Sequence, residues 1–134
     1  MNKQILTCAG ALALLVACTG CPVLVVGAVA GAGAATYAYV NGEVESTLSA
    51  GMDKTWSATL AALKDLQFNT GKTSKDALNG HVESTTADGK SITIKLKRVS
   101  DTLTEVDIRV GKFGDQRVSD LILDKIKSHL GPTT

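Results

Sequence analysis

Three cysteines are the residues of this 134-residue chain whose type and spacing best suit chemistry. Cys8 lies inside an apolar run that ends at Leu15-Val16-Ala17-Cys18, and Cys21 follows shortly after. A branched apolar residue, small residues and then a cysteine are typical of a lipobox, in which the new N-terminal cysteine takes a diacylglycerol on its sulfur. We therefore predict lipidation at Cys18, with Cys21 as the alternative.

The residues before Cys18 complete an export signal. Met1-Asn2-Lys3 supplies one positive charge, and the apolar stretch 5–15 is too short to span a bilayer alone. An ordinary signal peptide, or an uncleaved anchor helix with cysteines as small apolar side chains, is the alternative interpretation. We expect 1–17 to be a lipoprotein signal peptide. Because Thr19 and not aspartate follows Cys18, we expect the mature protein on the periplasmic face of the outer membrane.

The rest of the chain predicts neither a catalytic nor a metal site. All cysteines lie at or before position 21, which excludes a disulfide framework or zinc cluster from 22–134. Cys18 and Cys21 have the spacing of a redox pair, but a lipidated cysteine has no free thiol. His81 and His129 stand alone, and the 13 acidic residues are dispersed. We expect no enzyme activity, no cofactor and no metal.

One further segment, Gly111-Lys112-Phe113-Gly114-Asp115, suggests a site. It lacks the spacing of a phosphate-binding loop. We interpret it as a sharp strand-to-helix turn in which Phe113 covers the edge of the core and Asp115 caps the next helix. Anion binding by exposed loop amides is the alternative.

Charge divides the chain into two parts. No Asp, Glu, Lys or Arg lies between Lys3 and Glu43, and the whole chain has a formal net charge of only +1, which excludes a basic nucleic-acid-binding surface. Residues 18–40 comprise the predicted anchor cysteine and a Gly/Ala-rich apolar stretch. This stretch could lie on the membrane as a helix, span it, or form a flexible tether. Tyr37 and Tyr39 at its end could lie at headgroup level.

Residues 41–134 have the periodicity of one small domain. Apolar spacing predicts a helix over 51–66 that places Trp56 in the core. It predicts a second helix from Asp115 to the stop at Gly131-Pro132. The apolar stripe of the second helix comprises Val118, Leu121, Ile122, Ile126 and Leu130.

Alternating polar and apolar residues predict the strands. One strand covers 39–46 and a short one 67–73, and three more cover 80–87, 91–99 and 103–110. Asp88-Gly89 marks the hairpin between the strands 80–87 and 91–99. After the next turn, at 100–102, Lys95 or Lys97 could face Glu105 or Asp107 of the strand 103–110. We expect an α+β fold: an antiparallel sheet of four to five strands with two helices packed on one face, preceded by an apolar N-terminal segment. The other face of the sheet would be wet.

Four segments together carry a resemblance. They are Tyr39-Val40-Asn41-Gly42-Glu43-Val44-Glu45, Trp56 through Leu66, Ala87-Asp88-Gly89-Lys90, and Ile108 through Asp115. The chain resembles a family of small bacterial lipoproteins, domain of unknown function thirty-five sixty-eight. In that family the lipid-bearing cysteine stands just before the Gly-rich run, which favours Cys21 over Cys18, so both stay open. Gln67 stands where the family often has Gly after the first helix. The resemblance implies no catalytic residue, substrate or partner.

Two functions from different classes remain. We favour a lipid-anchored envelope lipoprotein, attached to the membrane by its N-terminal lipid, whose small non-catalytic periplasmic domain binds another envelope protein or supports an assembly. It predicts a solvated sheet face or an exposed edge strand that a partner could extend. The alternative is a small-ligand carrier with a groove between sheet and helices. An aromatic content of 4% argues against the carrier.

Overall fold

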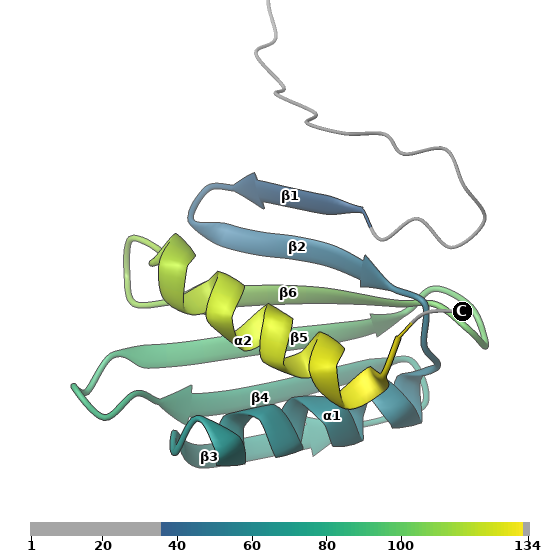
Figure 1. Cartoon of the computed structure of the whole chain (residues 1–134), viewed down its shortest axis with the longest axis horizontal. Coiled ribbons are helices and arrows are strands. Elements are labelled where there is room, and N and C mark those ends of the chain that lie inside the picture. Colours follow the sequence, from purple (N-terminus) through teal and green to yellow (C-terminus); the bar gives the residue numbers. More distant parts are fainter. Residues whose placement is uncertain (1–35, 133–134) are drawn as a thin grey trace, which may run out of the picture.

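A computed structural model describes residues 36–132, which form one layer of antiparallel strands and one layer of helices (Figure 1). The strand order is β1-β2-β6-β5-β4-β3, and the expected α+β fold is confirmed. The strands are β1 (Tyr37–Val40), β2 (Glu43–Leu48), β3 (Asn69–Lys75), β4 (Asn79–Thr85), β5 (Ser91–Arg98) and β6 (Thr104–Val110), and the helices are α1 (Met52–Asp65) and α2 (Gln116–Leu130).

Both helices lie on the same face of the sheet, as predicted. α2 packs over β2 and β6, and α1 packs over β3 and β5, with the two helices in contact (Figure 1). Alternate strand side chains point towards the helices and are buried, which is the pattern of a sheet with one wet face. The buried apolar side chains of the strands are Val44, Leu48, Val82, Ile92, Ile94, Leu96, Val106, Ile108 and Val110. Trp56 packs only partly buried against this core.

The sheet has six strands, so the expected four to five was too low. The segment predicted as one strand over 39–46 is a hairpin that turns at Asn41-Gly42. Asn41 has φ 51° and Gly42 has φ 83°, the left-handed geometry that a two-residue hairpin turn needs and that Asn-Gly favours. The sheet therefore begins at Tyr37, within the stretch predicted to lie next to the membrane.

Two predicted side-chain positions are wrong. Phe113 does not cover the core: it is 93% exposed, because the turn between Gly111 and Gly114 projects it outward. Leu121 is 50% exposed, and Leu123 is buried instead. The buried face of α2 centres on Ser119, Ile122, Leu123 and Ile126. At 3.6 residues per turn, Leu121 points away from this face.

The connection from α1 to β3 contains a residue in an unfavourable conformation. Gln67 has φ 58°, in the left-handed region that glycine adopts most readily. Its N–H donates to the carbonyl of Lys64 at 3.0 Å, and the next N–H, of Phe68, donates to Leu63 at 3.0 Å. The chain thus ends α1 with a left-handed residue although no glycine is present.

Candidate functional site

The sheet has two edges, and the edge formed by β1 is open. β1 has the sequence Tyr37-Ala38-Tyr39-Val40, without any charge. Tyr37 is 36% exposed, Tyr39 39% and Val40 44%. Three of the five aromatic side chains of the chain, Tyr37, Tyr39 and Phe113, are therefore exposed. Aromatic side chains are enriched in protein interfaces relative to the rest of the surface.

The register of β1 fixes which of its backbone groups are available. Thr47 N–H donates to the carbonyl of Thr36 at 2.9 Å, and Ala38 lies opposite Glu45 in the same register. In an antiparallel ladder, residues alternate between facing the neighbouring strand and facing away from it. The N–H and C=O groups of Tyr37 and Tyr39 therefore point outward from the sheet. These groups can receive a further strand.

One tyrosine side chain at this edge, that of Tyr37, is held by α2. The Tyr37 hydroxyl donates to the Asp120 carboxylate at 2.7 Å and accepts from the Gln116 amide at 3.1 Å. Partial burial, and next the hydrogen bond to Asp120, raise the pKa of Tyr37 above its usual value. The phenol thus stays protonated and keeps β1 attached to the helix layer. The open edge is a defined surface.

The opposite edge, β3, has the features of a protected edge. Every residue of β3 is exposed and polar or glycine, and its register against β4 shifts between Thr70 and Thr73. Lys72 and Lys75 lie on this strand, and Lys75 pairs with Asp53 and lies over the Trp56 ring, 5.9 Å from its centroid. Lysines and an irregular register both oppose the addition of another strand.

The solvated face of the sheet gathers carboxylates that are far apart in the sequence. Glu45 pairs with Asp107 across β2 and β6, and Asp107 pairs with Lys95 across β6 and β5. Asp107 is half-buried, and within residues 36–132 its Oδ1 atom is buried without a hydrogen-bond partner. Burial first, and then the charges of Glu105, Glu45 and Glu43, raise the pKa of Asp107 to about 6.

The sequence predicted only part of this cluster of acidic side chains. The pairs Lys95–Asp107 and Lys97–Glu105 confirm the predicted facing of lysines and acids. The approach of Glu45 from the other side was missed, because it requires the long-range pairing of β2 with β6. Between residues 36 and 132, no group of three or more His, Cys, Asp or Glu has the geometry to hold a metal ion.

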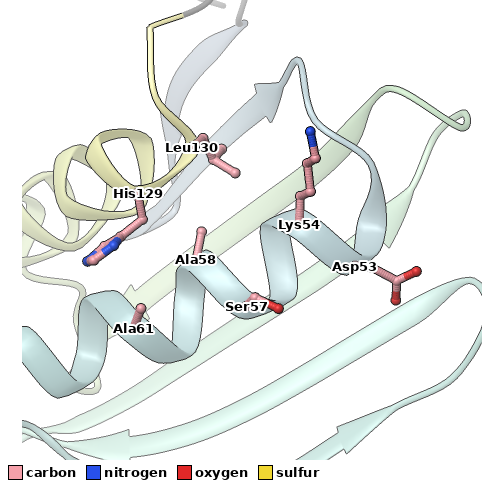
Figure 2. Close-up of a pocket in the computed structure, with 7 residues that line it drawn as sticks. All are labelled: Asp53, Lys54, Ser57, Ala58, Ala61, His129 and Leu130. Carbon is pink, nitrogen blue, oxygen red and sulfur yellow. The ribbon is translucent and has the colours of Figure 1, made fainter.

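An open groove of about 620 Å³ lies between α1 and α2 (Figure 2). It is lined by Asp53, Lys54, Ser57, Ala58, Ala61, His129 and Leu130, so its lining holds no Phe, Tyr or Trp. The His129 imidazole lies 2.8 Å from the Asp65 carboxylate, which joins the C-terminal turns of the two helices. His81 lies 3.4 Å from Glu83. Each of the two histidines therefore has a carboxylate neighbour.

The loop from Gly111 to Asp115 has a structural role in this fold. A β-carbon at Gly114 would lie 2.2 Å from the carbonyl oxygen of Gly42, so the loop contacts the β1–β2 turn backbone to backbone. Asp115 accepts from the Val118 N–H at 3.3 Å and from Lys90 at 2.9 Å, and the Lys90 ammonium lowers the pKa of this carboxyl. The predicted helix cap at Asp115 is confirmed.

The predicted lipidation residues Cys18 and Cys21 lie outside the described residues, as do 1–35 in general. From residue 36 to residue 132, no helix has both the length and the apolar character needed to cross a membrane. The two comparisons with known proteins give one match. A family model described as a protein of unknown function (DUF3568) matches residues 3–129. No curated protein matches the chain.

Proposed function

The chain belongs to the DUF3568 family, and we propose that it is a lipid-anchored bacterial envelope lipoprotein whose small non-catalytic domain binds another protein. The observation that carries the binding role is the contrast between the two sheet edges. β1 offers outward backbone groups and exposed tyrosines, whereas β3 is blocked by lysines and an irregular register. A partner strand added at β1 would gain main-chain hydrogen bonds and two tyrosine side chains to pack against.

The proposed anchor is supported by the lipobox that ends at Cys18 and by the apolar stretch that leads into β1. A domain attached in this way stays within a short reach of the bilayer, on the periplasmic face of the outer membrane. Its partner is then another envelope component. The near-zero net charge supports an anchor of lipid rather than electrostatic docking onto anionic headgroups.

Intact-mass analysis of the mature chain tests the anchor. We expect a chain that begins at Cys18 and carries a diacylglycerol, with Cys18→Ala losing the lipid and Cys21→Ala retaining it. The reverse pattern would assign the lipid to Cys21, in agreement with the family resemblance. A mature chain that still begins with Met1 and carries no lipid would contradict the anchor.

The binding role is tested with a photo-crosslinking amino acid placed at either edge in living cells. At Tyr39 we expect a discrete protein adduct, whereas the same group at Ser74 in β3 should give none, because both positions are exposed but only β1 can accept a strand. Equal adducts at the two positions would contradict a specific role for β1.

A small-ligand carrier would need a binding groove, and one open groove lies between α1 and α2. That groove is open and lined by small side chains, Asp53, Lys54, one histidine and one leucine, which gives an apolar ligand little surface to pack against (Figure 2). The polar groups nearby serve the fold, since His129 links the helices through Asp65. We therefore favour the binding domain over the carrier.

A further inference from the structure

We infer that the partner of β1 is a second copy of this chain, added strand to strand across a two-fold axis that passes beside Ala38. This inference rests on the proposed binding role of β1 and names the partner. In the assembly, β1 of each copy runs antiparallel to β1 of the other, and the two six-stranded sheets become continuous.

The backbone of β1 is complementary to itself in this arrangement. The outward N–H and C=O groups belong to Tyr37 and Tyr39, with Ala38 between them. If Ala38 lies opposite Ala38 of the second copy, each Tyr37 lies opposite a Tyr39 of the other chain. Each such pair exchanges two hydrogen bonds. This register pairs every outward group between Tyr37 and Tyr39.

The side chains of β1 also suit a second copy. Tyr37 and Tyr39 alternate with Ala38, so the two tyrosines of each copy lie together on the helix side of the sheet, and cross-strand aromatic pairs stabilise antiparallel strands. Alanine at the axis leaves room for the two chains to approach. β1 carries no charge, so no like charges meet. The same pairing at β3 would bring Lys72 and Lys75 of two copies together.

The size of this junction predicts its strength. A strand of four residues with its exposed aromatics buries less than the ~1,200 Å² of a typical stable interface, so we expect weak association in dilute solution. The proposed lipid anchor compensates, because confinement to one bilayer raises the effective concentration of each copy for the other. A two-fold axis along the membrane normal directs both N-termini to the same bilayer.

Disulfide trapping tests the pairing in membranes that contain the full chain. Ala38 would form a non-hydrogen-bonded pair with Cα atoms ~4.5 Å apart, within the range of a disulfide. We expect Ala38→Cys to yield at least about tenfold more crosslinked dimer under mild oxidation than Ser74→Cys, an exposed cysteine on the opposite edge. The unsubstituted chain measures how much crosslinked dimer the native cysteines form by themselves. Equal dimer yields from both variants, or none from Ala38→Cys, would overturn the inference.

A charge-reversal experiment provides a second, independent test. Ala38→Lys places two lysines opposite each other across the axis, and Ala38→Glu places two glutamates there, so each variant alone should lose energy transfer between labelled copies in the membrane. Coexpression of the two variants should restore it, because the opposing charges then attract. Ala38 lies opposite Glu45 of β2, so the lysine variant gains a partner within its own chain, whereas the glutamate variant meets a like charge there. The diagnostic result is therefore the rescue: if coexpression does not restore energy transfer, the inference is overturned.

The outcomes separate this inference from the proposed function. If the Tyr39 probe captures a different envelope protein and Ala38→Cys stays monomeric, the second copy is ruled out and the binding role of β1 stands. If Ala38→Cys forms dimers in a chain that carries no lipid, the self-pairing stands and the anchor is wrong.

Discussion

The two halves of the sheet differ in how they are assembled and in how they end. One half of the sheet ends at β3. Its elements follow one another along the chain in the order α1, β3, β4 and β5, and α1 packs over these strands (Figure 1). In the other half, β1 pairs with β2, β2 pairs with the distant β6, and α2 covers β2 and β6. The first half ends in a polar strand with lysines and an irregular register, whereas the second ends in Tyr37–Val40.

This difference indicates which edge is used. An open edge strand promotes unwanted association, so an edge that only meets water is usually blocked by charge or irregularity. β3 follows that rule and β1 does not. The unblocked edge also directly follows the apolar segment that we propose to lie near the membrane. Three substitutions, described from the largest expected effect to the smallest, test how far the two halves differ.

The first prediction concerns the contact between the β1–β2 turn and the loop that precedes α2. Gly114 and Gly89 have nearly the same φ, 82° and 85°, but a β-carbon at Gly114 would lie 2.2 Å from the Gly42 oxygen, whereas one at Gly89 meets nothing within 4 Å. We expect Gly89→Ala to lower the free energy of unfolding by about 1 kcal/mol, and Gly114→Ala by about 3 kcal/mol or more. Urea denaturation measures both. Equal losses would show that the Gly42–Gly114 contact contributes little to the β1 half.

The second prediction concerns the carboxylates gathered on the solvated face of the β1 half. The folded-state pKa of Asp107, about 6, lies above its ordinary value of 3.8, so folding favours the neutral form. The stability gained from protonating Asp107 is present at low pH and is lost as the pH rises through 6. We expect Asp107→Asn to raise the free energy of unfolding at pH 7 by about 1–2 kcal/mol, since water still partly screens this half-buried carboxyl.

The pH dependence makes this second test specific. The advantage of Asp107→Asn should shrink as the pH falls from 6 towards 4, because the wild-type carboxyl then becomes neutral in the folded state. Thermal or urea unfolding at several pH values measures it, with Asp124→Asn on the exposed side of α2 as the control. A gain that is independent of pH would contradict the raised pKa.

The third prediction compares the left-handed residues of the two halves. Gln67, at the end of α1, has φ 58°, and Asn41, in the β1–β2 turn, has φ 51°. Asparagine tolerates this conformation better than glutamine does. We expect Gln67→Gly to raise the free energy of unfolding by about 0.5–1 kcal/mol, and Asn41→Gly to change it by less. A destabilising Gln67→Gly would mean that the side chain contributes more than its backbone conformation costs.

Local features of the chain were the ones that could be predicted. The β4–β5–β6 meander follows from the alternation of polar and apolar residues on either side of Asp88-Gly89. The cap of α2 by Asp115 could also be predicted, because a capping residue stands directly before the apolar stripe of its helix. The Asn41-Gly42 turn has an equally local signal, which was overlooked because the polar alternation continues through it. This omission removed one strand and with it the edge that now carries the proposed function.

Other features depend on contacts between distant segments. Glu45 and Asp107 are separated by most of the domain, and only the pairing of β2 with β6 brings them together and raises the pKa of Asp107. Phe113 reads as a core residue by composition, yet the contact of Gly114 with Gly42 orients the loop so that the ring is exposed. Neither outcome has a signal within a short window of sequence.

Element type and order therefore follow from periodicity, turn residues and caps, because each of these acts over a few neighbouring residues. The lipobox and the charge-free N-terminal stretch are also local sequence signals, and they support the proposed location in the cell envelope. The position of a strand in the sheet cannot be predicted from such local signals. Whether a strand is central or terminal depends on which distant strand pairs with it, and here the pairing of β2 with β6 left β1 with a free side. The open edge at Tyr37–Val40 exists only in the folded chain.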